Sequence, residues 1–169
     1  GARETIHAFR EDADVTAIET LPNRIEPSGW TLSADRQEIL DHADRFARKE
    51  LHPLQQRMDD EEWWPPQVMP RLGEMGFLGV TAPGELGGAD SDLFASGLIA
   101  QALGRWNHAV SLSYVAHENL CLNNILRNGN DDVRARFVPG LCAGTAIGAL
   151  GLTEPGAGSD ALGSMRTTA

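Results

Sequence analysis

Lysine is almost absent from this sequence of 169 residues, which contains Lys49 alone, and its arginines are scattered rather than gathered into a stripe. The formal net charge is −10. Binding to phosphate backbones or to anionic lipid surfaces requires clustered lysine and arginine. The composition therefore argues against a general nucleic-acid-binding protein and against a membrane-surface binder. A small anionic ligand could still be bound by a few aimed backbone N–H groups.

Cysteine and long apolar runs are also scarce. Cys121 and Cys142 lack metal-ligand spacing and a nearby His or Cys partner, so we expect buried, reduced thiols and no disulfide framework. No apolar run is long enough to cross a bilayer, which predicts no membrane insertion. Residues 1–20 lack the apolar core of a signal peptide and carry too many acids for a transit peptide.

Motifs for metal binding and for nucleophilic catalysis are missing as well. The five histidines form no H-E-x-x-H pair, so no metal site is expected, and scattered histidines of this kind are surface or satisfied core residues. They are His7, His42, His52, His108 and His117. The G-x-S-x-G elbow of serine hydrolases is absent. The four consecutive acids of "DDEEWW", residues 59–64, cannot converge on one bond, so we expect a solvated loop there, anchored by its two tryptophans.

Apolar residues at helical spacing dominate the sequence from residue 31 to about residue 145. Ser33 is a predicted N-cap, His52-Pro53 is predicted to stop the first helix, and Asn130 is predicted to cap the last. Ser91 or Asp92 is predicted to cap the third helix, and Gly76 to follow the second. The expected helices cover 34–51, a start at Pro65, Pro66 or Pro70 running to 75, then 92–105, 108–128 and 131–141. This pattern predicts a mainly α fold, an antiparallel helical bundle with short or moderate loops.

The pattern changes at "AIGALGLT", residues 146–153, which has no helical face and predicts a β-strand. A lone strand leaves its backbone donors and acceptors unpaired, so a sheet domain should follow it. We therefore divide the chain into a poorly ordered extension over 1–30, an N-terminal helical domain over 31–145, and the start of a truncated β domain over 146–169.

The loop "LTEPGAGSD" that follows is the strongest candidate for a binding site. Taken alone, its glycines and proline are typical of a turn without further role. Gly156 and Gly158 could, however, bring backbone N–H groups and the Ser159 hydroxyl against a pyrophosphate. The preceding backbone and the Thr153 hydroxyl suit the polar edge of a planar heterocycle. The loop is not G-x-G-x-x-G leading into a helix, which disfavours a Rossmann site.

Three collinear segments resemble the acyl-CoA dehydrogenase family. "LGLTEPGAGSD", residues 150–160, resembles the family's flavin-binding signature, and "LGEMGFLGVTAPGELGGADSD" is similar to its loop between helices. "LSYVAHENLCLNNILRNGN", residues 112–130, is similar to the isovaleryl-CoA dehydrogenase branch. The resemblance covers residue 31 to the end of the chain. It implies a fold of an N-terminal helical domain, a middle β domain and a C-terminal helical domain, of which this chain supplies the first and the opening of the second.

The resemblance also implies a cofactor, FAD, and a set of site residues. Leu152 and Thr153 would meet the isoalloxazine edge, and Ser159 would approach both the flavin pyrophosphate and the acyl-CoA substrate. The implied flavin-binding residues are Leu150, Gly151, Leu152, Thr153, Glu154, Pro155, Gly156, Ala157, Gly158 and Ser159. The implied reaction is α,β-dehydrogenation of a short acyl-CoA, branched in the isovaleryl branch, with electrons passing to an electron-transfer flavoprotein.

The family's catalytic base, a Glu of the C-terminal domain, would lie beyond Ala169, so no catalytic residue is assigned and the chain alone is expected to be inactive. Glu118 and Glu154 are not candidates for that role. The resemblance further implies a homotetramer, in the bacterial cytoplasm or the mitochondrial matrix. Two alternatives stay open: a non-catalytic helical interaction module, and a related flavin acyl-CoA oxidase. Acyl-chain length is left undetermined, because it depends on the volume of a pocket that missing helices help to form.

Overall fold

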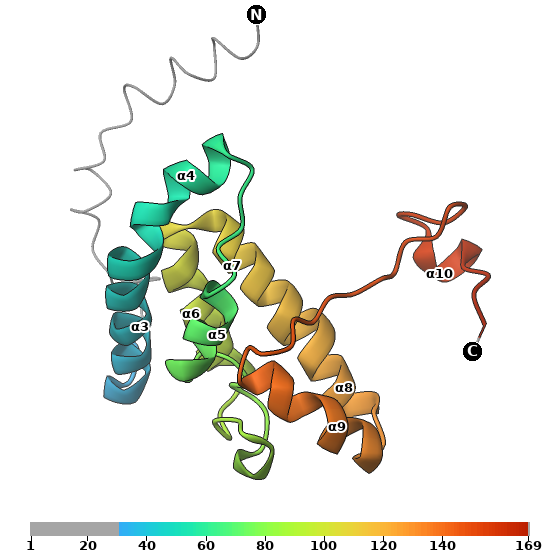
Figure 1. The fold of residues 1–169 in the computed structure, drawn as a ribbon. Coiled ribbons are helices and arrows are strands. Elements are labelled where there is room, and N and C mark those ends of the chain that lie inside the picture. Colours follow the sequence, from blue (N-terminus) through green and yellow to red (C-terminus); the bar gives the residue numbers. More distant parts are fainter. Residues whose placement is uncertain (1–30, 169) are drawn as a thin grey trace, which may run out of the picture. The chain divides into compact units, whose positions relative to one another are not determined.

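The structure is a computed structural model that describes residues 31–168, and almost every element in it is helical (Figure 1). The predicted extension over 1–30 lies outside the described residues. The α-helices are α3 (Ala34–Phe46), α4 (Gln55–Asp60), α5 (Val68–Glu74), α6 (Leu93–Trp106), α7 (His108–Val115), α8 (Asn123–Asn128), α9 (Asp131–Cys142) and α10 (Ala161–Ser164). Wider π-helical segments are η1 (Ala47–Leu51) and η4 (Ala116–Leu122), and 3-10 turns are η2 (His52–Leu54) and η3 (Gly84–Leu86). The predicted mainly α fold is confirmed.

The first predicted helix does not stop at His52-Pro53. After α3 the chain stays helical through η1 and η2 and continues directly into α4. Pro53 lies in the first turn of η2, where its missing N–H and fixed φ are tolerated. The proline therefore changes the kind of helix rather than ending it.

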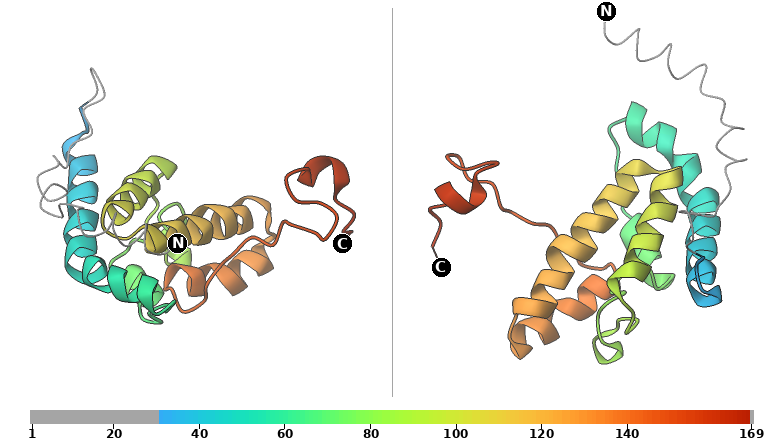
Figure 2. Two further views of the ribbon diagram at one scale, coloured as in Figure 1. Left: turned by 90° about the horizontal axis from the view of Figure 1, so that it is seen from above. Right: turned by 180° about the vertical axis from the view of Figure 1, so that it is seen from behind.

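Helix α6 is the centre of the bundle and packs against α3 on one side and α7 on the other (Figures 1 and 2). Ser111 Oγ donates to Ala100 O at 2.7 Å, and the Ser96 and Tyr114 hydroxyls lie 3.1 Å apart, so α6 and α7 run antiparallel. Trp106 Nε1 donates to Asp44 Oδ1 at 2.8 Å near the end of both α3 and α6, which run parallel. The expected antiparallel packing thus holds for the hairpin of α6 and α7.

Side-chain caps set the starts of the main helices, as the sequence predicted for two of them. The Asp92 carboxylate accepts from Ala95 N–H at 2.9 Å, and the Asn130 side chain accepts from Val133 N–H at 2.9 Å. Asn107 caps α7 in the same way, so a single residue separates α6 from α7. Gly76 follows α5 with a φ of 71°, as predicted for that position.

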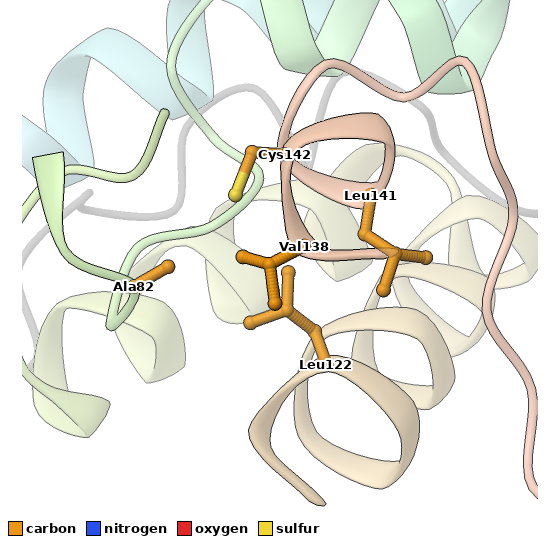
Figure 3. Packing of buried hydrophobic residues seen from close by; sticks show 5 residues of the cluster. All are labelled: Ala82, Leu122, Val138, Leu141 and Cys142. Carbon is orange, nitrogen blue, oxygen red and sulfur yellow. The ribbon is translucent and has the colours of Figure 1, made fainter. Parts of the chain in front are cut away.

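An apolar cluster joins α9 to η4, which is the middle part of the long helix formed by α7, η4 and α8. Figure 3 shows Leu122 of η4 facing Val138 and Leu141 of α9, with Cys142 and Ala82 beside them. Ala82 belongs to the loop between α5 and α6, so this cluster ties the loop, η4 and α9 together. Cys142 is buried and Cys121 half-buried, and both are free thiols.

The predicted strand over 146–153 is not formed, because within residues 31–168 no second strand pairs with it. The described chain has no regular secondary structure between α9 and the bridge of Glu154 to Ala157, and the short helix α10 then follows. A strand requires a ladder of hydrogen bonds to a neighbour, which residues 146–153 do not find here.

Candidate functional site

The segment 150–159 lies open to solvent over most of its length. Leu150 and Leu152 are 46% and 45% exposed, and Thr153 and Ser159 are exposed as well. Single exposed apolar side chains are ordinary, but exposed apolar side chains that lie together can mark a ligand or interaction surface. The segment therefore presents apolar side chains and a hydroxyl together, which is the composition that binding sites for planar cofactors use.

A tight turn shapes the middle of the segment. Glu154 and Ala157 exchange both backbone hydrogen bonds, at 3.0 and 3.1 Å, and Ala157 is buried. Within the part of the chain that the structure describes, the N–H groups of Gly156, Gly158 and Ser159 make no hydrogen bond. The N–H of Ala157 between them is used within the turn, whereas those of Gly156, Gly158 and Ser159 stay open on an exposed bend and could donate to an anion.

The glycines of the bend are not needed by the chain's own packing. An ideal Cβ at Gly151, Gly156 or Gly158 would meet nothing within 4 Å, and none of the three has a left-handed φ. Elsewhere in the chain, glycines are required by contact: at Gly148 a Cβ would lie 2.6 Å from the Cβ and Sγ of Cys121. The space beside the three open glycines is free for the close approach of a ligand.

The two acids of the loop are occupied by local hydrogen bonds. The Glu154 carboxylate accepts from the N–H groups of Arg166 at 2.9 Å and Thr167 at 2.8 Å. Hydrogen bonds from the side chain and backbone of Thr167 hold the pKa of Glu154 below its usual value. Asp160 caps α10 by accepting from Gly163 N–H at 3.2 Å. Both carboxylates therefore close the loop on itself, and neither is placed as a proton acceptor.

Two buried polar side chains to which the sequence analysis gave no functional role are His117, whose ring contacts Gly148 just before this segment, and its neighbour Glu118. His117 and Glu118 are consecutive, fully buried residues of η4. Glu118 accepts the N–H groups of Gly79 at 2.9 Å and Val80 at 2.7 Å, which fixes the loop between α5 and α6. Burial raises the pKa of Glu118 above its usual value. In the sequence, the two residues could have been found as a His-Glu pair among the apolar positions of a predicted helix.

A family model described as the acyl-CoA dehydrogenase N-terminal domain matches residues 33–145. This chain belongs to the acyl-CoA dehydrogenase family. The predicted resemblance is confirmed. His117 is a buried core residue whose two ring nitrogens both have hydrogen-bond partners. The described residues contain no group of His, Cys, Asp and Glu that could hold a metal ion. None of the described helices combines the length and apolar character that a membrane span needs.

Alignments with relatives in the acyl-CoA dehydrogenase family cover most of this chain but only part of each relative. Isovaleryl-CoA dehydrogenase of Bos taurus is 36% identical over 136 residues, which is 76% of this chain and 31% of the relative. An acyl-CoA dehydrogenase of Bacillus subtilis is 37% identical over 124 residues, which is 73% of this chain and 32% of the relative. The chain thus spans about a third of the length of these relatives.

Solved structures of the family share the fold. A glutaryl-CoA dehydrogenase of Mycobacterium smegmatis, in complex with FADH2, superposes with a TM-score of 0.75 at 29% identity, covering 80% of this chain and 35% of that one. The helical arrangement described above is therefore that of an acyl-CoA dehydrogenase N-terminal domain. The family match ends at residue 145, before the segment 150–159 begins.

Proposed function

We propose that this chain supplies the N-terminal third of a flavin-dependent acyl-CoA dehydrogenase, which oxidises a short acyl-CoA thioester between its α and β carbons. The observation that carries the proposal is the open glycine bend over 150–159, which directly follows helices of the family. Its glycines meet nothing in the chain itself, so the backbone of the bend is open to the close approach of a ligand.

FAD fits this segment. Leu152 and Thr153 would lie along the isoalloxazine edge, while Ser159 and the free N–H groups of the bend would bind the pyrophosphate. The flavin, when bound, supplies the capacity to accept a hydride. The whole set proposed for binding is Leu150 to Ser159, with Glu154 and Ala157 shaping the turn and Ser159 also near the acyl-CoA. The FADH2 in the similar glutaryl-CoA dehydrogenase supports this choice of cofactor.

No residue of this chain is proposed as the catalytic base. Glu118 is buried against Gly79 and Val80, and Glu154 closes its own loop, so neither could reach an α-proton. We propose that the base comes from another part of the protein, as the family resemblance implies. The chain's contribution is to orient the flavin edge and to cover it with apolar side chains.

Exposed apolar side chains on the helices support packing against further structure. Leu112 of α7 is 73% exposed, Leu120 of η4 is 43% exposed, and Ile147 before the candidate segment is 67% exposed. We propose that the remaining domains of the protein cover them. We also propose a homotetramer, with an electron-transfer flavoprotein as redox partner, in the bacterial cytoplasm or the mitochondrial matrix.

A chimera tests the proposed function. Residues 33–169 of this chain would replace the matching first third of the 37%-identical Bacillus subtilis enzyme. We expect the chimera to retain FAD and to reduce an artificial dye on addition of butyryl-CoA or isovaleryl-CoA. The ratio of the rates with the two thioesters would report on acyl-chain branching.

The isolated chain is the control for the chimera. A single exposed segment buries little of a flavin, whereas cofactor sites bury most of the ligand surface, so we expect the chain alone to lose FAD on gel filtration and to reduce no dye. A folded chimera without FAD, or one that holds FAD and does not respond to any acyl-CoA, would contradict the proposal. Oxygen consumption in place of dye reduction would instead favour an oxidase.

A further inference from the structure

His117 connects three parts of the chain through one buried ring. Its Nδ1 accepts the N–H of Gly148 at 3.0 Å, and its Nε2 lies 3.1 Å from the carbonyl oxygen of Leu141 near the end of α9. The ring is fully buried. Gly148 is itself buried, and the exposed residues that follow it lead into the candidate flavin segment.

The two hydrogen bonds fix both the charge and the tautomer of the ring. The Gly148 N–H can only donate, so Nδ1 must carry no proton, and the Leu141 oxygen can only accept, so Nε2 must carry one. Burial also lowers the pKa of His117 below its usual value, which favours the neutral ring. Besides His117, η4 carries the titratable residues Glu118 and Cys121, and α9 carries Asp131, Asp132, Arg134, Arg136 and Cys142. The Glu118 carboxylate faces Gly79 and Val80, and burial raises the pKa of Cys142 to about 11.

Gly148 is held from a second side by the same helical segment. A Cβ on Gly148 would lie 2.6 Å from the Cβ and Sγ of Cys121 and 3.2 Å from Leu141 Cδ2. His117 and Cys121 both belong to η4, whose wider π turn places them against one short stretch of backbone. Segments of π-helix inside α-helices are frequent at functional sites.

From this geometry we propose that His117 is a positioning residue for the flavin-contacting segment. As a neutral imidazole protonated on Nε2, it links Gly148 to α9. It thereby fixes the position of the backbone from which Leu150 to Thr153 extend. This role rests on the proposed function, because it matters for chemistry only where that segment contacts a flavin. Without the Nδ1 acceptor, the backbone at Gly148 can move away from η4. The residues that follow Gly148 are then no longer held in a fixed position relative to the helices.

Two substitutions separate the two ring nitrogens. In His117→Asn the side-chain oxygen stands near the position of Nδ1 and can still accept from Gly148. In His117→Gln the amide nitrogen stands near the position of Nε2 and can still donate to Leu141. Each variant therefore keeps one of the two hydrogen bonds, while both remove the imidazole and its bulk.

Amide hydrogen exchange measured by NMR on this chain gives the decisive comparison. We expect the Gly148 amide to exchange on the order of tenfold faster in His117→Gln than in the wild type, and His117→Asn to stay close to the wild type. Equal exchange rates in the two variants, or the reverse order, would overturn the proposal. The wild-type imidazole nitrogen shifts should show an unprotonated Nδ1 and a protonated Nε2 near neutral pH, and any other protonation pattern would also overturn it.

The pH profile is a further readout. Because the folded pKa of His117 lies below the unfolded value of 6.5, the folded chain binds fewer protons, and the Gly148 protection should fall as the pH drops below that value. In the chimera, His117→Gln should bind FAD on the order of tenfold more weakly than His117→Asn. Equal FAD affinities would overturn the positioning role. The proposed function is decided separately, by whether the chimera with His117 intact holds FAD at all.

Discussion

The Glu118→Ala variant of this chain is expected to unfold with a free energy about 2 to 4 kcal/mol lower than the wild type. The substitution removes the acceptor for the N–H groups of Gly79 and Val80 and leaves both donors buried without a partner. It also opens a cavity, since the Glu118 side chain is fully buried. Urea denaturation followed by far-UV circular dichroism would measure the loss.

The loop that Glu118 holds explains why the effect should be large. Ala89 N–H donates to Gly79 O at 3.0 Å, and Ser91 N–H donates to Val80 O at 2.9 Å. The two residues that Glu118 binds therefore also position the end of the loop that leads into α6. Ala82, a little further along, belongs to the apolar cluster with α9. One carboxylate therefore supports the contact of η4, the loop and α9 together.

Two further variants serve as controls for the loss of stability expected in Glu118→Ala. Glu118→Gln keeps one acceptor oxygen and the side-chain volume, so its loss should be smaller than that of Glu118→Ala. Glu85→Ala removes an exposed acid from the same loop and should change the free energy of unfolding by no more than about 0.5 kcal/mol. A Glu118→Ala variant as stable as Glu85→Ala would show that the two N–H groups find other partners.

Local signals in the sequence predicted the helices well because their causes are local. Asp92 and Asn130 cap helices by accepting an N–H three residues later, and Gly76 adopts a left-handed conformation one residue beyond the C-cap of α5. The stop predicted at Pro53 was wrong, because a proline in the first turn of a 3-10 helix lacks no needed donor. The π-helical segments leave no distinct sequence pattern, so they were not predicted.

The candidate site was predicted from its glycines and from a family resemblance. The contact of His117 with Gly148, which holds the start of the segment, was not predicted. Gly148 meets His117, which lies 31 residues earlier in the chain, and Glu118 meets Gly79 across 39 residues. Such contacts depend on how helices pack, and no periodicity of one segment reveals them. The predicted strand over 146–153 is not formed within the described residues for a related reason, since a strand exists only where a partner supplies its hydrogen bonds.

The second large effect is expected at Gly144, where Gly144→Ala should lower the free energy of unfolding by about 3 kcal/mol. Gly144 has a φ of 68°, which costs an L-residue about 1 to 2 kcal/mol. An ideal Cβ there would lie 2.2 Å from the carbonyl oxygen of Met69 and 2.8 Å from Pro70 N. These atoms belong to the backbone of α5, which cannot yield without moving the helix, so the strain and the overlap add.

Gly156→Ala is the matched control, because Gly156 has an ordinary φ and open space around it. It should leave the free energy of unfolding within about 0.5 kcal/mol of the wild type. In the chimera with the Bacillus subtilis enzyme, however, the added methyl group would occupy the approach of the pyrophosphate, and FAD content should fall. Equal losses of stability in the two variants would contradict the distinction between a glycine required by packing and one left open for a ligand. A Gly156→Ala chimera with full FAD content would show that the flavin does not approach the backbone of the bend at that residue.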